Sequence, residues 1–260
     1  MTAERFLEAD NLSMSFGGLK AVNSVNFHVD EGRIISIIGP NGAGKSTIFN
    51  MVTGFYVPTE GEIFFKGQKI SGLTPQEVVK LGISRTFQNL RVFPSLKVIE
   101  NVMIGTHINV HYNLMDSTFR TKKYRDDEAL KVAECISILK ELDLYDVKDE
   151  IAGSLPYGIQ RKVEIARAIA TGAKLLLLDE PAAGMNPNES EELLDFIKFL
   201  QKKGYTILLI EHDMQVVMNV SDYIYVLNFG NLIAEGTSSQ IKNNPEVIKA
   251  YLGSKDHAVN

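Results

Sequence analysis

The chain has 260 residues, 45% of them hydrophobic and 23% charged, with a formal net charge of −5. This composition is typical of a folded protein with a large core, and the acidic balance argues against nucleic acid as a partner. The single cysteine excludes an internal disulfide and suits a reducing compartment. No signal peptide is expected near the N-terminus, and no apolar run approaches the ~18 residues of a membrane span.

The first half of the chain contains two kinds of strand-like segment. Residues 5–29 alternate between apolar and polar side chains, and Ile63–Phe65 with the turn around Gly67 continue this extended character. Other segments are unbroken apolar runs, which predict parallel strands covered on both faces. These runs are Ile34–Ile38, Leu175–Leu178 and Ile207–Ile210. With helical patterns between them, they predict an α/β core, a mostly parallel sheet with flanking helices.

A glycine-rich loop follows the first apolar run and is the strongest indication of the class of protein. Its sequence fits G-x-x-x-x-G-K-[ST], the phosphate-binding loop, which needs a buried strand before it and a helix after it. Gly42 and Gly44 lack Cβ atoms, so backbone N–H groups can close around a β-phosphate at the positive end of the helix. The candidate nucleotide-binding residues are Gly39, Pro40, Asn41, Gly42, Ala43, Gly44, Lys45, Ser46 and Thr47. Lys45 is expected to reach the phosphates, and the Ser46 hydroxyl to hold Mg²⁺.

The middle of the chain has a different sequence pattern, because strand-like runs are absent and helical patterns dominate. We predict one domain, residues 1–260, in which a helical sub-domain at 89–164 interrupts an α/β core formed by 1–88 and 165–240. An N-terminal antiparallel β sub-domain belongs to this core, and residues 241–260 form a C-terminal segment.

Within the predicted helical sub-domain, Glu128–Leu142 has a helical pattern, whereas His107–Arg125 is polar and aperiodic and predicts a loop or irregular helices. The basic residues of Arg120–Arg125 are followed by acids and predict a solvated surface. Cys135 lies in an apolar helical stretch and is expected to be a small core residue rather than a nucleophile.

Two patterns in the last third of the chain predict a capped helix and a hairpin. Asn186 suits an N-cap, and the apolar stripe that follows can end at Gly204. Tyr223–Leu227 and Leu232–Ala234 flank Gly230-Asn231, which predicts a β-hairpin.

Acidic and polar residues follow the buried runs at the edge where ligands of α/β sheets gather. Asp179 is expected to be the Mg²⁺-associated carboxylate, and Glu180 could polarise a water for attack on the γ-phosphate. Without a phosphate-binding loop, two surface acids at a strand end would explain the pair equally well. His212 follows the third run, where it could face the same crevice. Gln88, taken alone, is more often a turn glutamine.

Together these motifs resemble those of ATP-binding-cassette (ABC) ATPases over nearly the whole chain. The family carries a signature segment shortly before the Asp-Glu strand, and the matching segment here is Ser154–Arg161, followed by a helix expected over Lys162–Thr171. The resemblance implies a P-loop NTPase fold and an ATPase that uses ATP and Mg²⁺. It also implies that Gly158, at the start of this helix, binds the γ-phosphate held by a second cassette.

The same resemblance assigns roles to single residues. Gln88 matches the glutamine that senses Mg²⁺ and contacts the membrane partner, and His212 matches the histidine that contacts the γ-phosphate. Asp179 and Glu180 match the Walker B acid and the catalytic base. Phe16 falls where the family places an aromatic ring that stacks on adenine, although a core strand residue is an equal alternative. The implied catalytic residues are Lys45, Gln88, Glu180 and His212, and the implied metal ligands are Ser46, Gln88 and Asp179.

A finer resemblance is to the cassettes that energise branched-chain amino-acid import in bacteria. It is carried by the segments Phe16–Val22, Thr53–Tyr56, Arg85–Gln88, Asp179–Gly184, Ile210–Met214 and Ala250–Gly253. It implies a second cassette, identical or paralogous, transmembrane permease subunits and, indirectly, a solute-binding protein. The implied location is the cytoplasmic face of the bacterial inner membrane. Cassettes for urea, amides or other amino acids would share these motifs.

The signature segment departs from the family pattern at Pro156, where serine is usual. Proline has neither an N–H nor a hydroxyl, so one donor to the γ-phosphate is expected to be missing. Gly158 and the helix dipole remain. We therefore expect weaker contact with the ATP of a second cassette and slower turnover than in a serine variant.

Two other classes of protein explain fewer of the motifs. Soluble ABC proteins of translation or repair usually hold two cassettes or a long coiled coil, whereas this chain has one phosphate-binding loop and no sustained heptads. A P-loop kinase or GTPase would leave Leu155–Arg161 and His212 unexplained, and the chain lacks a guanine-reading N-K-x-D element.

Overall fold

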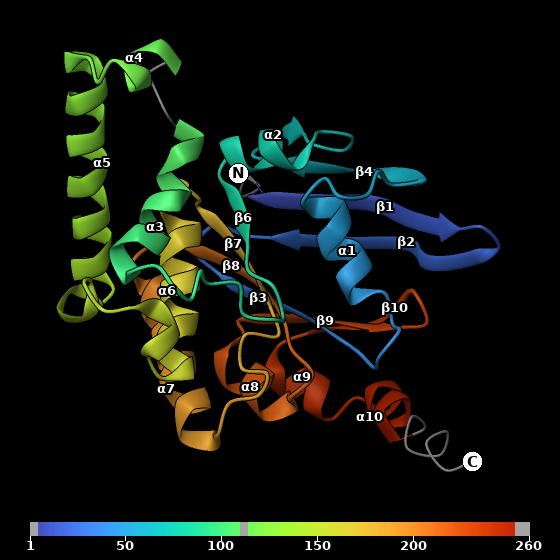
Figure 1. Ribbon diagram of the computed structural model, residues 1–260. Helices are drawn as coiled ribbons and strands as arrows, with labels where there is room; N and C mark the ends of the chain where they lie inside the picture. The colour runs from blue at the N-terminus through green and yellow to red at the C-terminus, as the bar shows by residue number, and fades with distance from the viewer. Residues whose placement is uncertain (1–4, 110–113, 253–260) are drawn as a thin grey trace.

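The computed structural model describes residues 5–109 and 114–252 and contains two sheets with helices around them (Figure 1). The smaller sheet is antiparallel, with the strand order β2-β1-β4-β5. Its strands are β1 (Leu7–Phe16), β2 (Leu19–Val29), β4 (Glu60–Phe65) and β5 (Gln68–Lys69). Lys66 and Gly67 form the β4–β5 turn with positive φ. The predicted antiparallel sub-domain is therefore confirmed.

The larger sheet has six strands in the order β10-β9-β3-β8-β7-β6. Its strands are β3 (Ile34–Ile38), β6 (Ile83–Arg85), β7 (Leu175–Asp179), β8 (Thr206–Ile210), β9 (Tyr223–Asn228) and β10 (Asn231–Gly236). All neighbours pair in parallel except β10, which pairs antiparallel with β9. The predicted mostly parallel α/β core is confirmed, and β6 is an addition that the sequence patterns did not reveal.

The three predicted apolar runs are buried throughout because both faces of the sheet are covered. Ile35 and Ile37 point into a core shared with helix α1 (Lys45–Val52) and the antiparallel sheet. The intervening Ile34 points into a second core with helices of the opposite face. Successive strand residues alternate between faces, so an unbroken apolar run satisfies two cores at once.

The remaining helices lie mostly after β6. They are α2 (Pro75–Lys80), α3 (Val98–Thr106), α4 (Leu114–Thr118), α5 (Lys122–Glu141), α6 (Tyr157–Ile169), α7 (Pro187–Lys202), α8 (Met214–Val220), α9 (Ser238–Lys242) and α10 (Pro245–Leu252), with short 3₁₀ turns at His107–Asn109, Tyr145–Val147 and Ala152–Ser154. Between β6 and β7, the described chain consists of helices and loops, and its only β pairing is one isolated bridge, Lys97–Ile151. The expected sub-domain boundary at 164/165 falls inside α6, so that division remains a prediction.

Two helices begin earlier than their apolar patterns predicted. Helix α5 begins at Lys122 rather than near Glu128, because the Thr121 side chain caps it by accepting from the Tyr124 amide. Helix α6 begins at Tyr157 rather than Lys162, directly after Pro156. Within the expected irregular segment, residues 110–113 lie outside the described part of the chain.

The capped helix and the hairpin near the end of the chain are both present. The Asn186 side chain accepts from the Glu189 amide at 3.0 Å, and the Glu189 carboxylate accepts from the Asn186 amide at 3.1 Å, a reciprocal capping box. The hairpin loop, however, is Phe229-Gly230, with φ of 45° and 78°. Asn231 already pairs with Asn228, so the turn lies one residue earlier than predicted.

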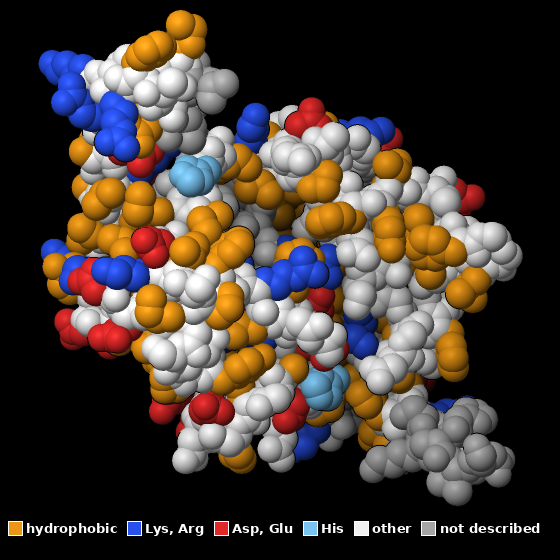
Figure 2. Space-filling view, in the orientation of Figure 1, with side chains coloured by type: hydrophobic (Ala, Val, Ile, Leu, Met, Phe, Trp, Pro, Cys, Tyr) orange, Lys and Arg blue, Asp and Glu red, His pale blue; other side chains and the backbone are white. Residues whose placement is uncertain are grey.

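Surface and interior follow the predicted pattern in the helical region. The basic side chains of Arg120–Arg125 are exposed, and Figure 2 shows Lys and Arg gathered at the corner where α4 meets α5. Cys135 is buried, and burial raises the pKa of its thiol to about 11, so it is a core residue. Across residues 5–109 and 114–252, no helix is long and apolar enough to cross a membrane.

Candidate functional site

The glycine-rich loop joins β3 to α1 in a conformation that two of its glycines make possible. Gly39 and Gly44 have φ of +153° and +104°. A Cβ on Gly39 would lie 2.2 Å from the Leu227 carbonyl oxygen, and one on Gly44 would lie 2.6 Å from the Ala21 carbonyl oxygen. Only glycine fits at these positions, where β2 and β9 press the loop from two sides.

The Lys45 side chain folds back into this loop. Its Nζ donates to the carbonyl oxygens of Gly39 at 2.6 Å and Pro40 at 3.0 Å, and the residue is only 6% exposed. Burial lowers the pKa of Lys45, while the nearby carboxylates of Glu180 and Asp179 act in the opposite direction. A desolvated ammonium at the start of a helix attracts an anion strongly.

The loop forms one wall of a cavity of about 500 Å³. Three of the predicted catalytic side chains, Gln88, Glu180 and His212, complete it. The lining residues are Ala21, Asn41, Gly42, Ala43, Gly44, Lys45, Ser46, Thr47, Gln88, Glu180 and His212. The structure therefore brings together groups that follow four separate strands, β3, β6, β7 and β8. From the sequence, their proximity was predicted only from the motifs that contain them.

Glu180 is the centre of the acidic side of this cavity. Its Oε2 accepts from Gln88 Nε2 at 2.8 Å and lies 3.5 Å from His212 Nδ1. The Glu180 backbone has φ of 46°, unusual for a non-glycine residue, and its N–H donates to the Ile210 carbonyl at 2.8 Å. This anchoring to β8 turns the carboxylate out of the β7 strand direction and into the cavity.

Asp179 lies behind the cavity wall in a buried ion pair. Its Oδ2 is 2.5 Å from Arg85 Nη2, and both side chains are 9% exposed. Arg85 Nη1 also donates to Asn50 Oδ1 at 2.6 Å, and the guanidinium lies over the rings of Phe49 and Phe87. Sequence reasoning quoted Arg85 within a motif and missed this role.

Arg85→Met should lower the free energy of unfolding by about 3–5 kcal/mol, because it leaves the Asp179 carboxylate buried without its partner. Arg33→Met is the matched control, since Arg33 pairs with Asp222 at 3.3 Å with its own side chain 58% exposed. That loss should stay below about 1 kcal/mol. Urea unfolding monitored by circular dichroism measures both, and equal effects would contradict a structural role for the Arg85 pair.

Glu211 is a second residue that sequence reasoning missed. It is 1% exposed, and its Oε1 accepts from the Ala182 amide at 3.0 Å. Burial raises the pKa of Glu211, while the Ala182 amide and the neighbouring His212 act against that rise. The contact holds the backbone after Glu180 against the segment that carries His212.

Besides Asp179, four predicted site residues lie outside this cavity. Phe16 is 42% exposed at the end of β1, with its ring edge-to-face on Tyr56 at 5.3 Å, so it is not a core residue. Gly158 is in the first turn of α6 and does not line the cavity either. Gly39 and Pro40 instead line a neighbouring pocket, together with Asn41.

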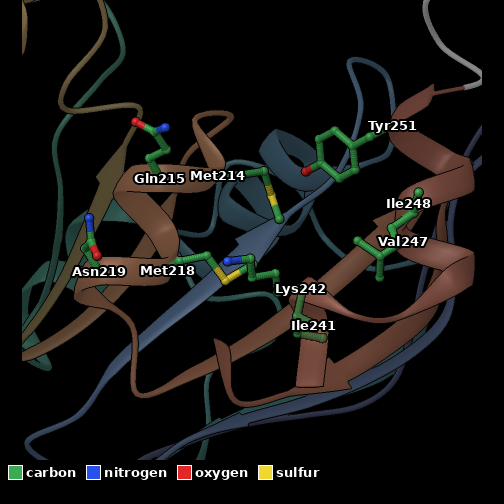
Figure 3. Close-up of a pocket in the computed structure, with 9 residues that line it drawn as sticks. All are labelled: Met214, Gln215, Met218, Asn219, Ile241, Lys242, Val247, Ile248 and Tyr251. Carbon is green, nitrogen blue, oxygen red and sulfur yellow. The ribbon is translucent and has the colours of Figure 1, made fainter. Parts of the chain in front are cut away.

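The C-terminal helix reaches the phosphate-binding loop from the other side. Tyr251 of α10 faces Met214 of α8 across an apolar pocket of about 600 Å³ (Figure 3). Burial raises the pKa of Tyr251 to about 12, and its hydroxyl lies at the Gly39 backbone amide. The Ala250–Gly253 motif, of which Gly253 lies outside the described residues, thus packs part of the loop in place.

The oxygen donors at the cavity fit Mg²⁺. Gln88 donates to Glu180 through Nε2, which leaves its amide oxygen for a cation, and Ser46 adds a hydroxyl. The Asp179 carboxylate, the third predicted ligand, lies behind the cavity wall and is paired with Arg85. Within the described residues, no group of three His, Cys, Asp or Glu could hold a metal by itself.

Pro156 is the N-cap of α6, with φ of −53° and no side-chain capping bond. Pro156→Ser should raise ATP turnover about two- to tenfold, since one hydrogen bond to the γ-phosphate adds roughly 0.5–1.5 kcal/mol. The control is Pro187→Ser in the first turn of α7, where Asn186 still caps the helix. Steady-state phosphate release measures both, and an unchanged rate for Pro156→Ser would remove the inference.

Comparison with known proteins identifies the family to which this chain belongs. Residues 22–183 match the ABC transporter family, and residues 231–257 match the family described as branched-chain amino acid ATP-binding cassette transporter. The chain therefore belongs to the ATP-binding cassettes of ABC transporters, and it is an ATP-binding ATPase.

Particular relatives cover almost the whole chain. It is 46% identical over 248 residues to the high-affinity branched-chain amino acid transport ATP-binding protein BraF of Pseudomonas aeruginosa, covering 95% of this chain and 97% of BraF. It is 44% identical over 252 residues to LivG of Escherichia coli K12, covering 96% and 99%. A crystal structure of an ABC transporter cassette in its ADP conformation superposes with a TM-score of 0.84 at 36% identity, covering 96% of this chain and 99% of that one.

Proposed function

We propose that this chain hydrolyses ATP to power the import of branched-chain amino acids. The observation that carries the proposal is the match of residues 231–257 to the branched-chain cassette family. This segment lies outside the general nucleotide-binding region and includes Tyr251, which packs against the phosphate-binding loop. BraF and LivG, whose names state branched-chain amino acid transport, support the same solute class.

In the proposed chemistry, the loop amides and Lys45 bind the phosphates, and Phe16 stacks on adenine. Ser46, Gln88 and Asp179 would hold Mg²⁺, which neutralises charge on the phosphates. Glu180 accepts a proton from the attacking water, and its contact with Gln88 Nε2 orients the carboxylate. His212, with its side chain 58% exposed beside Glu180, is free to reach the γ-phosphate.

The proposed working unit contains two cassettes and membrane partners. Gly158 lies away from the cavity of its own chain, which supports contact with the nucleotide of a second copy or a paralogue. A dimeric structure of a related cassette with ADP and phosphate, 25% identical with a TM-score of 0.71, supports this arrangement. The chain would bind permease subunits at the cytoplasmic face of the membrane, and a solute-binding protein would act through them.

The test is ATPase activity of the chain co-purified with its permease subunits and reconstituted into proteoliposomes. A leucine-loaded solute-binding protein should stimulate phosphate release several-fold and drive leucine uptake. Urea, acetamide and a basic amino acid serve as the competing solutes. Stimulation by one of these instead of leucine would assign the cassette to a different solute. Failure to recover any membrane partner would favour a soluble ABC ATPase.

A further inference from the structure

Helix α6 carries a fully buried ion pair close to the signature segment. Arg161 is 0% exposed and Glu164 is 2% exposed, and Arg161 Nη1 lies 2.6 Å from Glu164 Oε2. On an isolated helix, an i,i+3 pair is a surface feature of small value. Burying a charged pair is costly, and hydrogen bonds from its remaining donors and acceptors offset that cost. Arg161 Nε is buried without a partner, so the other atoms of the pair supply these bonds. The contacts that satisfy this one are therefore informative.

Three of those contacts go to one loop, residues 87–91, which follows β6, and a fourth joins Arg161 Nη2 to the Tyr157 hydroxyl of its own helix at 3.2 Å. Arg161 Nη1 donates to the Phe87 carbonyl at 2.8 Å, and Nη2 donates to the Gln88 carbonyl at 2.9 Å. Glu164 Oε1 accepts from the Arg91 amide at 3.2 Å. Two side chains of one helix thus bind three backbone groups of the loop, from both ends.

The loop they bind carries the side chain that contacts Glu180. Gln88 Nε2 reaches Glu180 Oε2 at 2.8 Å, while its own carbonyl is fixed by Arg161. We infer that Arg161 and Glu164 are positioning residues: they tie the Gln88 loop to α6, so that movement of this helix displaces Gln88 relative to Glu180. The inference rests on the proposed function for the roles of Gln88 and Glu180.

A consequence concerns the first turns of the same helix. Gly158 lies in the first turn of α6, one turn before Arg161. In a two-cassette assembly, contact of this first turn with the nucleotide of the second cassette would hold α6 in place. The contacts of Arg161 and Glu164 with residues 87–91, here called the clamp, would then hold Gln88 in place in the first chain's own site. Each site would be set for hydrolysis only when the other holds nucleotide.

The first experiment measures the clamp without any activity. The double variant Arg161→Met/Glu164→Gln removes both charges together and keeps an acceptor for the Arg91 amide, which avoids leaving an unpaired buried charge. Amide hydrogen exchange in the isolated chain should accelerate about tenfold or more across residues 86–92 while helix α7 is unaffected. Lys162→Met, on the same helix but stacked on Phe196, should leave the loop unchanged. Unchanged exchange in the double variant overturns the clamp.

The second experiment places the clamp on the path to Gln88. In the reconstituted transporter, the double variant should lower kcat about tenfold or more while KM for ATP stays within about twofold, since only positioning is lost. Added to Gln88→Ala, it should cause no further loss of kcat. Multiplying losses would mean that Arg161 acts elsewhere and would overturn the inference.

Failure of the clamp and failure of the proposed function give different results. If no solute stimulates the transporter, the exchange experiment on the isolated chain still decides whether the clamp exists. Should the double variant not fold, Arg161→Lys takes its place, because an ammonium keeps the charge but cannot span two carbonyls in a fork. It should show the same loop-specific exchange at smaller amplitude, and normal protection there would reject the clamp.

Discussion

Glu180→Gln should lower ATP turnover by about 10²–10⁴-fold while ATP binding is retained, because the amide cannot accept a proton from water. The substitution preserves the shape of the side chain and an acceptor for Gln88 Nε2, which in the native chain lies 2.8 Å from Glu180 Oε2. Lys45 and the loop amides, which bind the phosphates, are untouched. Without hydrolysis the two-cassette state should accumulate, so the variant should elute as a dimer in ATP and as a monomer without it.

Glu235→Gln on the exposed side of β10 is the matched control, since it makes the same chemical change away from the cavity. It should leave turnover and elution unchanged. Single-turnover phosphate release and size-exclusion chromatography in ATP measure the two effects separately. Rapid hydrolysis by Glu180→Gln would remove the assignment of the base, and loss of ATP binding would instead point to a folding defect at the end of β7.

The sequence predicted the parts of this fold that repeat along the chain or fit a motif. The strand Ile34–Ile38 was predicted because its four isoleucines fall on both sides of the strand and need two covered faces, and the phosphate-binding loop follows it at a fixed spacing. β6 was missed because three residues are too few to show a period. Helix α5 was predicted too short because its first turns are polar and begin at a cap, Thr121, rather than at an apolar stripe.

The residues that support the site were harder to predict than those that line it. Glu180 and His212 follow apolar strand segments, so their positions can be recognised in the sequence. Arg85 and Arg161 are polar residues whose partners lie 94 and 73 positions away, at Asp179 and Gln88. Nothing local distinguishes them from solvated side chains. Only the pairing of β6 with β7 and the packing of α6 bring these partners together.

Lys45→Met should weaken ATP binding about 100-fold, because two charge-assisted hydrogen bonds to phosphate, roughly 3 kcal/mol in all, are lost together. The free chain should tolerate the change, since methionine fills a similar volume and the lost partners are the Gly39 and Pro40 carbonyls. Lys203→Met is the control, because its side chain is 43% exposed, lies near Glu141 and does not line the cavity. Calorimetric titration with a non-hydrolysable ATP analogue measures the affinities, and thermal unfolding confirms the fold.

The pH dependence of binding separates the charge of Lys45 from its shape. Burial lowers the pKa of Lys45 below its ordinary value of 10.5, so the ammonium loses its proton at a lower pH than a solvated lysine does. ATP affinity of the native chain should therefore fall as pH rises through this lowered pKa, whereas the weak affinity of Lys45→Met should stay flat. Bound phosphate raises the pKa again, because an anion favours the charged form, and ATP binding should take up protons in the same range. Equal pH profiles for the two chains would show that the ammonium does not bind the phosphates.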